Sequence, residues 1–262
     1  MKKIFLITIN ICLAVLLFTA CDDFLDIQPT GKVIPKTGRE FRALLTEAYS
    51  AFPSDRGKTV FRSDELVLDN ATTTSEGLNS FLDLWRWMDD DVDENTSSFS
   101  WRSFYYVSYI ANTIIEQGMS MTEATDSERS QLVGEAYMLR AYTHFVLVNL
   151  FGEPYTHCNP EQTKAIPLKL NSDVNAILKR NTVAEVYASI LSDLEKGEQL
   201  LNVETWDVGY TYRFNKLSVD AFRARVYLYM GDWQNAYNYA HSVIEKHGDL
   251  EDLTTSKTLP SH

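Results

Sequence analysis

The sequence predicts an all-α fold built from irregular helical hairpins that resemble tetratricopeptide repeats. Apolar residues recur at helical spacing in several long segments. Thr37 with Glu40 and Thr182 with Glu185 form capping boxes, a pattern that marks the start of a helix. No segment of useful length shows the alternation of apolar and polar residues that a half-buried strand needs. Helices joined in pairs are therefore the expected architecture.

The first helix is expected directly after Thr37. An apolar stripe at helical spacing runs from Phe41 to Phe52, and Pro53 then ends the helix because proline cannot continue the hydrogen-bond ladder. A loop-like stretch follows, and a short helix is expected over about 78–88.

The middle of the chain predicts three longer helices. They are expected over about 101–118, 126–150 and 182–201, because each keeps one apolar face and ends near glycine, proline or a loop. Residues 155–181 are expected to be irregular. Trp101 falls inside the first of these predicted helices, so we expect it to lie in the core.

The last part of the helical region predicts one compact hairpin. Helices are expected from Asn215 to Met230 and from Trp233 to about Lys246, joined by a tight turn at Gly231. Small alanines in the second helix allow the two helices to pack closely. Because tetratricopeptide repeats are built in this way at about 34 residues each, this hairpin carries the likeness to that repeat.

The first residues have the layout of a secretory signal. Two lysines precede a mostly apolar stretch over 4–18, and small residues then lead into Cys21. The apolar stretch is shorter than the roughly 20 residues that a membrane-spanning helix needs. We interpret residues 1–20 as a lipoprotein signal peptide and Cys21 as the lipid-attachment site. An ordinary signal peptide, with the cysteine placed there by chance, is the alternative.

Three further segments complete the predicted organisation. Residues 21–36 contain prolines and a glycine without a helical period, which predicts an extended tether. Residues 37–250 form the predicted helical domain, and residues 251–262 form a polar tail.

Composition excludes several classes of function. Without residues 1–20 the chain has 22 basic and 36 acidic residues, a formal net charge of −14, which argues against nucleic acid as a partner. Cys158 is then the one thiol that is not acylated, so no internal disulfide is expected. The cysteine and histidine residues lack metal-ligand spacing, and we expect no metal, no cofactor and no catalytic residue.

Four stretches together resemble the N-terminal part of the SusD/RagB family. They are the start of the mature chain with its cysteine and acidic residues, a helix with a tryptophan, tyrosines and an Ala-Asn pair, the long central helix, and the closing hairpin. In order these are residues 21–31, 101–115, 134–154 and 215–244.

The resemblance implies a function as well as a fold. Members of this family are surface glycan-binding lipoproteins of Bacteroidetes that serve polysaccharide utilisation and nutrient uptake, and they are not enzymes. They hold oligosaccharide for a partner SusC-like TonB-dependent transporter in the outer membrane. Asp22 and Asp23 resemble the signal that sends such lipoproteins to the exterior, although two aspartates after the lipid also simply keep a tether soluble.

The sugar-binding residues expected from the sequence are Trp85 and Trp87, with Asp69 and Asn70 as polar partners. Sugar sites combine flat apolar faces with a few polar groups. If both tryptophans lie on one helix, they point about 200° apart, so one of them should be exposed. The alternative is that both pack against neighbouring helices. A second aromatic cluster, Trp206 with Tyr210 and Tyr212, is expected to be structural or to face a partner.

Length is the main departure from the family. Members continue past this point, so the resemblance implies that the C-terminal half is absent: the chain is expected to be truncated, as a gene fragment or a frameshift product, or else to be an unusually short member. Two competing functions remain open from the sequence: a helical-repeat scaffold that binds protein and no sugar, and an all-α glycosidase, for which we find no matched carboxylates.

Overall fold

The computed structural model describes residues 35–67, 81–88, 99 and 101–249. The chain divides into two compact units, Met1–Pro35 and Lys36–His262, and the described helices and strands all lie in the second. They are α3 (Gly38–Ser50), α4 (Asp55–Lys58), η1 (Thr59–Arg62), α6 (Leu82–Trp85), α7 (Arg102–Gln117), η2 (Gly118–Ser120), α8 (Asp126–Phe151), η3 (Tyr155–His157), β1 (Lys164–Pro167), β2 (Arg180–Thr182), α9 (Val183–Leu200), α10 (Lys216–Met230) and α11 (Trp233–Lys246). The all-α prediction is confirmed.

Capping residues define where the main helices begin. The boxes predicted at Thr37 and Thr182 are present, with each threonine hydroxyl accepting from the third helical backbone amide and the glutamate there reaching back. The same arrangement starts α8 at Thr125 and α10 at Asn215. These contacts satisfy backbone donors that the helix itself leaves unpaired.

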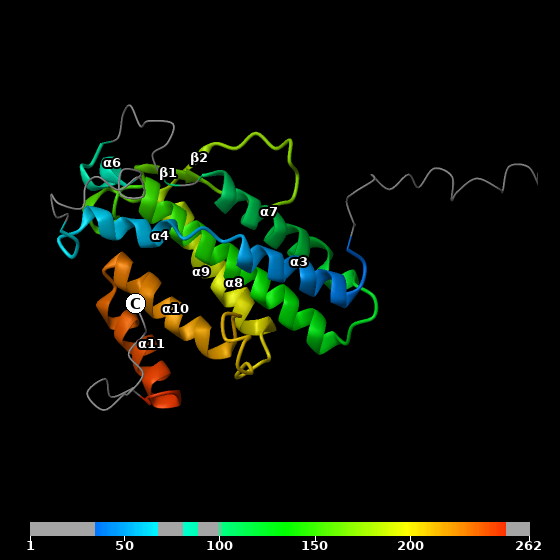
Figure 1. Cartoon of the computed structure of the whole chain (residues 1–262). Helices are drawn as coiled ribbons and strands as arrows, with labels where there is room; N and C mark the ends of the chain where they lie inside the picture. Colours follow the sequence, from blue (N-terminus) through cyan, green and yellow to red (C-terminus); the bar gives the residue numbers. More distant parts are fainter. Residues whose placement is uncertain (1–34, 68–80, 89–98, 100, 250–262) are drawn as a thin grey trace, which may run out of the picture. The chain divides into compact units, whose positions relative to one another are not determined.

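Helix α8 lies at the centre of the helical unit. It packs between α7 and α9, and α3 contacts both α7 and α8 (Figure 1). Most of its residues from Gln131 to Val148 are buried. Gly197 on α9 permits the close approach of α9 to α8, because a Cβ atom there would lie 2.9 Å from the Met138 sulfur.

The last hairpin follows the prediction. Helix α10 ends at Gly231, whose φ of 76° is the left-handed conformation that glycine adopts without strain. Helix α11 then packs back on α10, with Ala236 buried between them. Through its other face α10 contacts α9.

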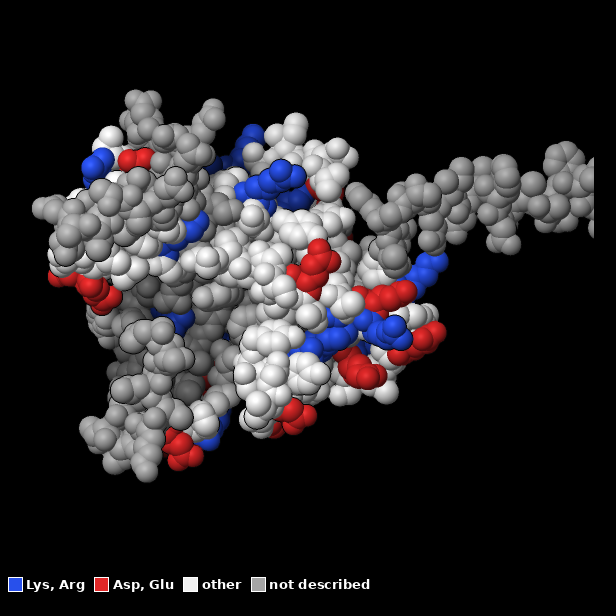
Figure 2. All heavy atoms as spheres, in the orientation of Figure 1, with Lys and Arg blue, Asp and Glu red and all other residues white. Residues whose placement is uncertain are grey.

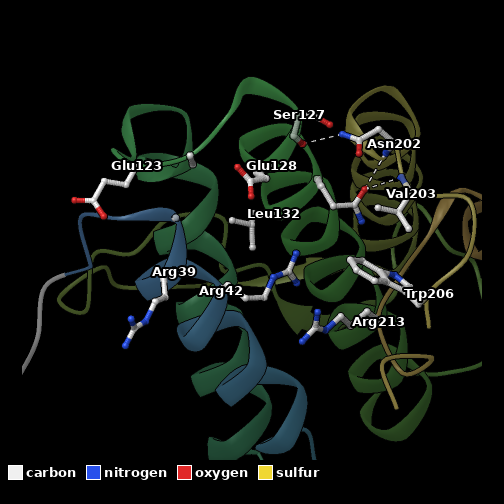
Figure 3. Close-up of a pocket in the computed structure, with 13 residues that line it drawn as sticks. Arg39, Arg42, Glu123, Ser127, Glu128, Leu132, Asn202, Val203, Trp206 and Arg213 are labelled. Carbon is white, nitrogen blue, oxygen red and sulfur yellow. Dashed lines mark hydrogen bonds between the residues drawn. The ribbon is translucent and has the colours of Figure 1, made fainter. Parts of the chain in front are cut away.

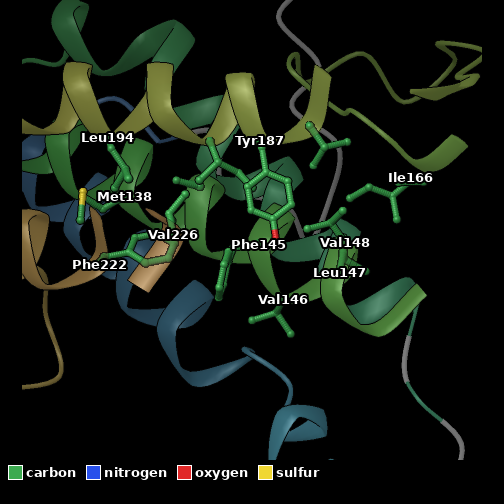
Figure 4. Close-up of a cluster of buried hydrophobic side chains, with 14 of the residues drawn as sticks. Met138, Phe145, Val146, Leu147, Val148, Ile166, Tyr187, Leu194, Phe222 and Val226 are labelled. Atoms are coloured by element: carbon green, nitrogen blue, oxygen red, sulfur yellow. The ribbon is translucent and has the colours of Figure 1, made fainter. Parts of the chain in front are cut away.

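Aromatic rings fill the core where α8, α9 and α10 meet. Phe145 meets Phe222 and Tyr187 edge to face, with ring centroids 5.3 Å and 6.4 Å apart. Figure 4 shows these rings gathered between the helices. Edge-to-face pairs of this kind add about 0.5–1.5 kcal/mol each to the stability gained from burial alone.

The structure differs from the sequence expectations in several places, among them the short helix expected over about 78–88, which covers only Leu82–Trp85. Strands β1 and β2 pair antiparallel within the stretch that was expected to be irregular, and they are too short for an alternation to be visible in the sequence. Short helices α4 and η1 lie in the stretch expected to be a loop. Trp101 was expected in the core but is 42% exposed, because it is the N-cap of α7 and not an interior helical residue.

A buried polar network ties α8 to three other parts of the fold. Arg140 on α8 donates two hydrogen bonds to the Asp193 carboxylate on α9, at 2.7 and 2.6 Å. It also donates to the Asn112 side chain on α7, at 2.7 Å. The Asn112 amide in turn donates to the carbonyls of Lys169 and Asn171 in the loop after β1.

Within the residues that the structure describes, no helix combines the length and apolarity needed to cross a membrane. The same residues contain no group of three or more His, Cys, Asp or Glu side chains placed to hold a metal ion. Cys158 is a free thiol.

Loss of one partner of the Arg140–Asp193 pair should destabilise the fold strongly. We expect Asp193→Ala to lower the free energy of unfolding by about 3–5 kcal/mol, because it leaves a buried guanidinium without its carboxylate. Urea unfolding followed by circular dichroism measures this. As a control, Lys216→Ala removes an exposed pair with Glu204 and should cost about 1 kcal/mol or less. Equal costs for the two variants would contradict this role of the pair.

Stability should fall in acid because of His144. Burial, with a smaller effect from the nearby Arg140 charge, lowers the pKa of the His144 imidazole to about 3. The unfolded chain takes up that proton at the ordinary pKa of 6.5. The contribution of His144 to the free energy of unfolding is therefore fully present above pH 6.5 and is lost progressively as the pH drops toward 3. We expect His144→Phe to reduce the slope of unfolding free energy against pH by about 1.4 kcal/mol per unit between about pH 6 and about 4.

The matched control for this slope is the exposed His157. In urea titrations at each pH, the His157→Gln variant should show the same slope of unfolding free energy against pH as the wild type. If His144→Phe shows the wild-type slope, the buried imidazole is not the source of the acid sensitivity.

Candidate functional site

The two predicted tryptophans lie at and just beyond the end of α6. Trp85 is its last residue and is 38% exposed, while Trp87 is 63% exposed. Both tryptophans are exposed, so the expectation that one of them would be is confirmed, and the alternative in which both pack against neighbouring helices is wrong. The argument from a separation of about 200° does not apply, because the helix ends at Trp85 and does not continue to Trp87. Trp87 has a φ of 58°, which a bulky side chain rarely adopts. Strained backbone of this kind is concentrated at functional sites.

Arg62, at the end of η1, supports the tryptophan segment. Its guanidinium lies 5.0 Å from the centroid of the Trp87 ring and 5.5 Å from that of Phe99. Its Nε also donates to the Leu84 carbonyl, at 3.3 Å. Next to it, Phe61 and Phe81 stack face to face with centroids 4.5 Å apart. The segment thus presents two indole rings with a cation beside one of them.

The other predicted site residues lie outside the described residues. This is the case for Asp69 and Asn70, for the acidic stretch 89–98, and for Cys21 with Asp22 and Asp23. Their assigned roles remain predictions.

A pocket of about 510 Å³ lies near the N-terminal end of α3 (Figure 3). Three parts of the chain form it: the first turns of α3, the first half of α8 with the residues before it, and the loop between α9 and α10. Its lining includes Arg39 and Arg42 from α3, Gln131 and Leu132 from α8, and Asn202, Val203, Trp206 and Arg213 from the loop. The second aromatic cluster of the sequence analysis therefore contributes to a cavity.

The fully buried Glu135 carboxylate holds the wall of this pocket in place. It accepts two hydrogen bonds from the Arg42 guanidinium, at 3.0 and 2.9 Å, one from Gln131 at 3.1 Å and one from the Tyr49 hydroxyl at 3.0 Å. Burial, and then the Glu135 charge, raises the pKa of Tyr49 well above its ordinary value, so the hydroxyl stays a donor. The Tyr49 oxygen also accepts from the Phe214 backbone amide, at 3.2 Å.

Arg213 lies among aromatic rings on the loop side of the pocket. Its guanidinium is 4.2 Å from the centroid of Tyr210, 5.2 Å from that of Trp206 and 5.4 Å from that of Tyr212. The Arg42 guanidinium lies 5.6 Å from the same Trp206 ring. The indole N–H donates to the Phe214 carbonyl at 3.0 Å, which fixes the ring.

Sequence reasoning did not identify Arg42, Glu135 or Arg62 as site residues. Arg42 and Glu135 are 93 positions apart, and no local pattern relates them. Arg213 had a signal that was available in the sequence, because it lies directly between Tyr212 and Phe214 in a loop, with Tyr210 three residues before it.

Comparisons with known proteins agree with this fold. Residues 23–228 match the model of a SusD-like family described as starch-binding and associating with the outer membrane. A SusD-like protein, P38, from Formosa agariphila is 28% identical over 257 residues, which cover 96% of this chain and 47% of that protein. The chain spans about half the length of the relatives it matches.

Solved structures give the same answer for the fold. A SusD superfamily protein from Bacteroides thetaiotaomicron superposes with a TM-score of 0.63 at 22% identity, over 83% of this chain and 48% of that one. A laminarin-binding SusD-like protein superposes with a TM-score of 0.66 at 19% identity, over 83% and 45% of the two chains. The fold that these superpositions share with this chain defines a class of helical proteins built from hairpins. This chain belongs to the SusD-like family, and the resemblance found in the sequence is confirmed.

Proposed function

We propose that this chain is a glycan-binding lipoprotein that captures oligosaccharide at the outer surface of the outer membrane. The description of its family as starch-binding and associated with the outer membrane supports this. The name of one structural neighbour, a laminarin-binding protein, supports a polysaccharide as the class of ligand. Binding without catalysis is the proposed activity.

The exposed pair Trp85 and Trp87 is the observation that carries the proposal. Large aromatic rings gain free energy from burial, so two of them exposed two positions apart in the chain suit a ligand that covers them. Flat indole faces match the apolar faces of pyranose rings, and the Arg62 guanidinium lies beside the Trp87 ring. Asp69 and Asn70 are proposed as further polar partners.

The proposed setting is an import complex. Residues 1–20 serve as the leader, Cys21 carries the lipid, Asp22 and Asp23 direct export to the exterior, and residues 21–36 form the tether to the helical domain that begins at residue 37. A SusC-like TonB-dependent transporter is the proposed partner that receives the glycan. Two or three acyl chains anchor a protein firmly to a bilayer, whereas one does not.

A protein-binding scaffold without sugar binding is the second candidate function. It is favoured by an exposed apolar face on the last hairpin, where a groove of about 410 Å³ lies between α10 and α11. Trp233, Tyr237 and Leu228 line this groove and are at least half exposed. Trp233 therefore serves as a matched control for the tryptophans of the proposed sugar site.

Trp85→Ala and Trp87→Ala should each weaken glycan binding by about tenfold, because each removes an apolar ring face worth on the order of 1.5 kcal/mol when covered. Isothermal titration against laminarin and starch oligosaccharides measures this. Trp233→Ala removes an exposed tryptophan elsewhere and should leave the affinity unchanged.

The same titrations separate the two candidate functions. Sugar binding that is insensitive to Trp85 and Trp87 would remove the proposed site. No binding to any glycan, together with co-purification of a protein that Trp233→Ala abolishes, would favour the scaffold.

Cys21→Ala should abolish lipid attachment. Cells that express the wild-type chain should incorporate radiolabelled palmitate into it and retain it in the membrane fraction, since the thiol is the acylation site. The Cys158→Ala variant, which changes the free thiol of the helical domain, should label like the wild type. Equal labelling of wild type and Cys21→Ala would rule out the lipoprotein assignment.

A further inference from the structure

Two guanidinium groups lie against one indole ring in the pocket near the start of α3. Arg42 and Arg213 are 5.6 and 5.2 Å from the centroid of Trp206, and Figure 3 shows both guanidinium groups on the cavity side of that ring. Two positive charges held this close repel each other unless anions accompany them. The balance of charge around them therefore indicates what the pocket binds.

One of the two cations, Arg42, already forms an ion pair with a carboxylate. Both terminal nitrogens of Arg42 donate to the Glu135 carboxylate, which is buried below the pocket and has no exposed surface. A bidentate pair of this geometry neutralises the Arg42 charge and fixes the direction of the side chain.

Arg213 has no carboxylate partner among the described residues. Its Nε donates to the Tyr212 hydroxyl, at 3.3 Å, and its other contacts are with ring faces. Its terminal nitrogens, with four N–H donors, remain for a ligand. Arg213 as a whole is half-buried, so its side chain is partly removed from water.

The acidic residues that line the pocket, Glu123 and Glu128, do not pair with Arg213. The Glu128 carboxylate accepts from the Thr125 backbone amide and hydroxyl at the start of α8, at 2.8 and 2.9 Å. These hydrogen bonds lower the pKa of Glu128, so it stays charged in the cap. Glu123 lies on the opposite side of the pocket from Arg213 (Figure 3).

We propose that this pocket binds a sugar unit that carries a carboxylate, a uronate, with the carboxylate on Arg213 and the ring against Trp206. The planar guanidinium fork matches a carboxylate in a bidentate arrangement, and the fixed indole offers an apolar face to the pyranose. About 510 Å³ accommodates one or two sugar rings. The inference rests on the proposed glycan-binding function and names a ligand class for a second position on the molecule.

Titration of the purified full chain with an oligogalacturonate tests this, with its methyl ester as the uncharged counterpart. We expect the acid to bind and the ester to bind at least about tenfold more weakly, since only the acid forms a charge-assisted pair. Arg213→Gln should weaken binding of the acid about tenfold to a hundredfold. Arg213→Lys keeps the charge but loses the planar guanidinium fork, so its affinity for the acid should lie between that of the wild type and that of Arg213→Gln.

Arg225→Gln is the matched control. It removes the same charge from an arginine on α10 that lines the groove of the last hairpin and not this pocket, so binding should stay at the wild-type level. Circular dichroism and thermal unfolding of each variant exclude loss of fold as the cause of weaker binding. Trp206 fluorescence, compared between the wild type and Trp206→Phe, reports whether the ligand covers that ring.

The outcomes separate this inference from the proposed function. If Arg213→Gln binds the acid as the wild type does, or a tetraglutamate peptide competes as well as the sugar, the uronate site is refuted. If, in that case, Trp85→Ala binds a neutral glycan more weakly than the wild type does, the proposed function is still supported. If neither neutral nor acidic glycans bind, the proposed function fails, and the uronate site fails with it.

Discussion

The constraint on which this structure depends is the burial of charge on its central helix. Helix α8 is covered by neighbours along most of its length, yet it carries Glu135 and Arg140 among its buried residues. An isolated charge in such surroundings costs several kcal/mol, so each must find a partner on another element. Glu135 accepts hydrogen bonds from Arg42 and Tyr49 on α3. Arg140 donates hydrogen bonds to Asp193 on α9 and to Asn112 on α7. These pairs determine which helices lie against α8 and at what rotation.

The two aromatic sites lie at opposite ends of α3. The pocket with Trp206 uses the first turns of that helix, from Gly38 to Arg42. Trp85 and Trp87 are supported by η1, which follows α3 and α4 in the chain and contacts α6. Helix α3 therefore lies between the two, and the proposed sugar contacts are at two separate positions on the molecule.

Periodicity and caps allow most of the helices to be predicted, because both signals are local. The boxes at Thr37 and Thr182 need only four consecutive residues, and the turn at Gly231 needs one glycine in the left-handed region. The strands β1 and β2 could not be predicted in this way, since three or four residues are too few to show a period of alternation. Trp101 was misplaced because its face was counted as though the helix included it, whereas it caps that helix.

The candidate sites were predictable only in part, and for a physical reason. Two tryptophans close in sequence are visible in the chain, and the structure shows that Trp85 and Trp87 are both exposed, while their role in binding sugar stays a prediction. The charge balance of the pocket depends on pairs that are distant in sequence, such as Arg42 with Glu135, and only the fold brings them together. Whether Arg213 has a partner likewise depends on the position of every nearby acid.

The overall charge limits how such a pocket selects its ligand. The chain has a formal net charge of −12, and Figure 2 shows basic and acidic side chains interspersed over the described face that carries α3. A carboxylate approaching from solution is therefore not attracted from afar, and screening confines the pull of Arg213 to about 8 Å at physiological salt. Simple anions gain little from so short a range. A sugar acid gains the pair with Arg213 and the covered face of Trp206 together, so the pocket favours an anion that brings an apolar ring with it.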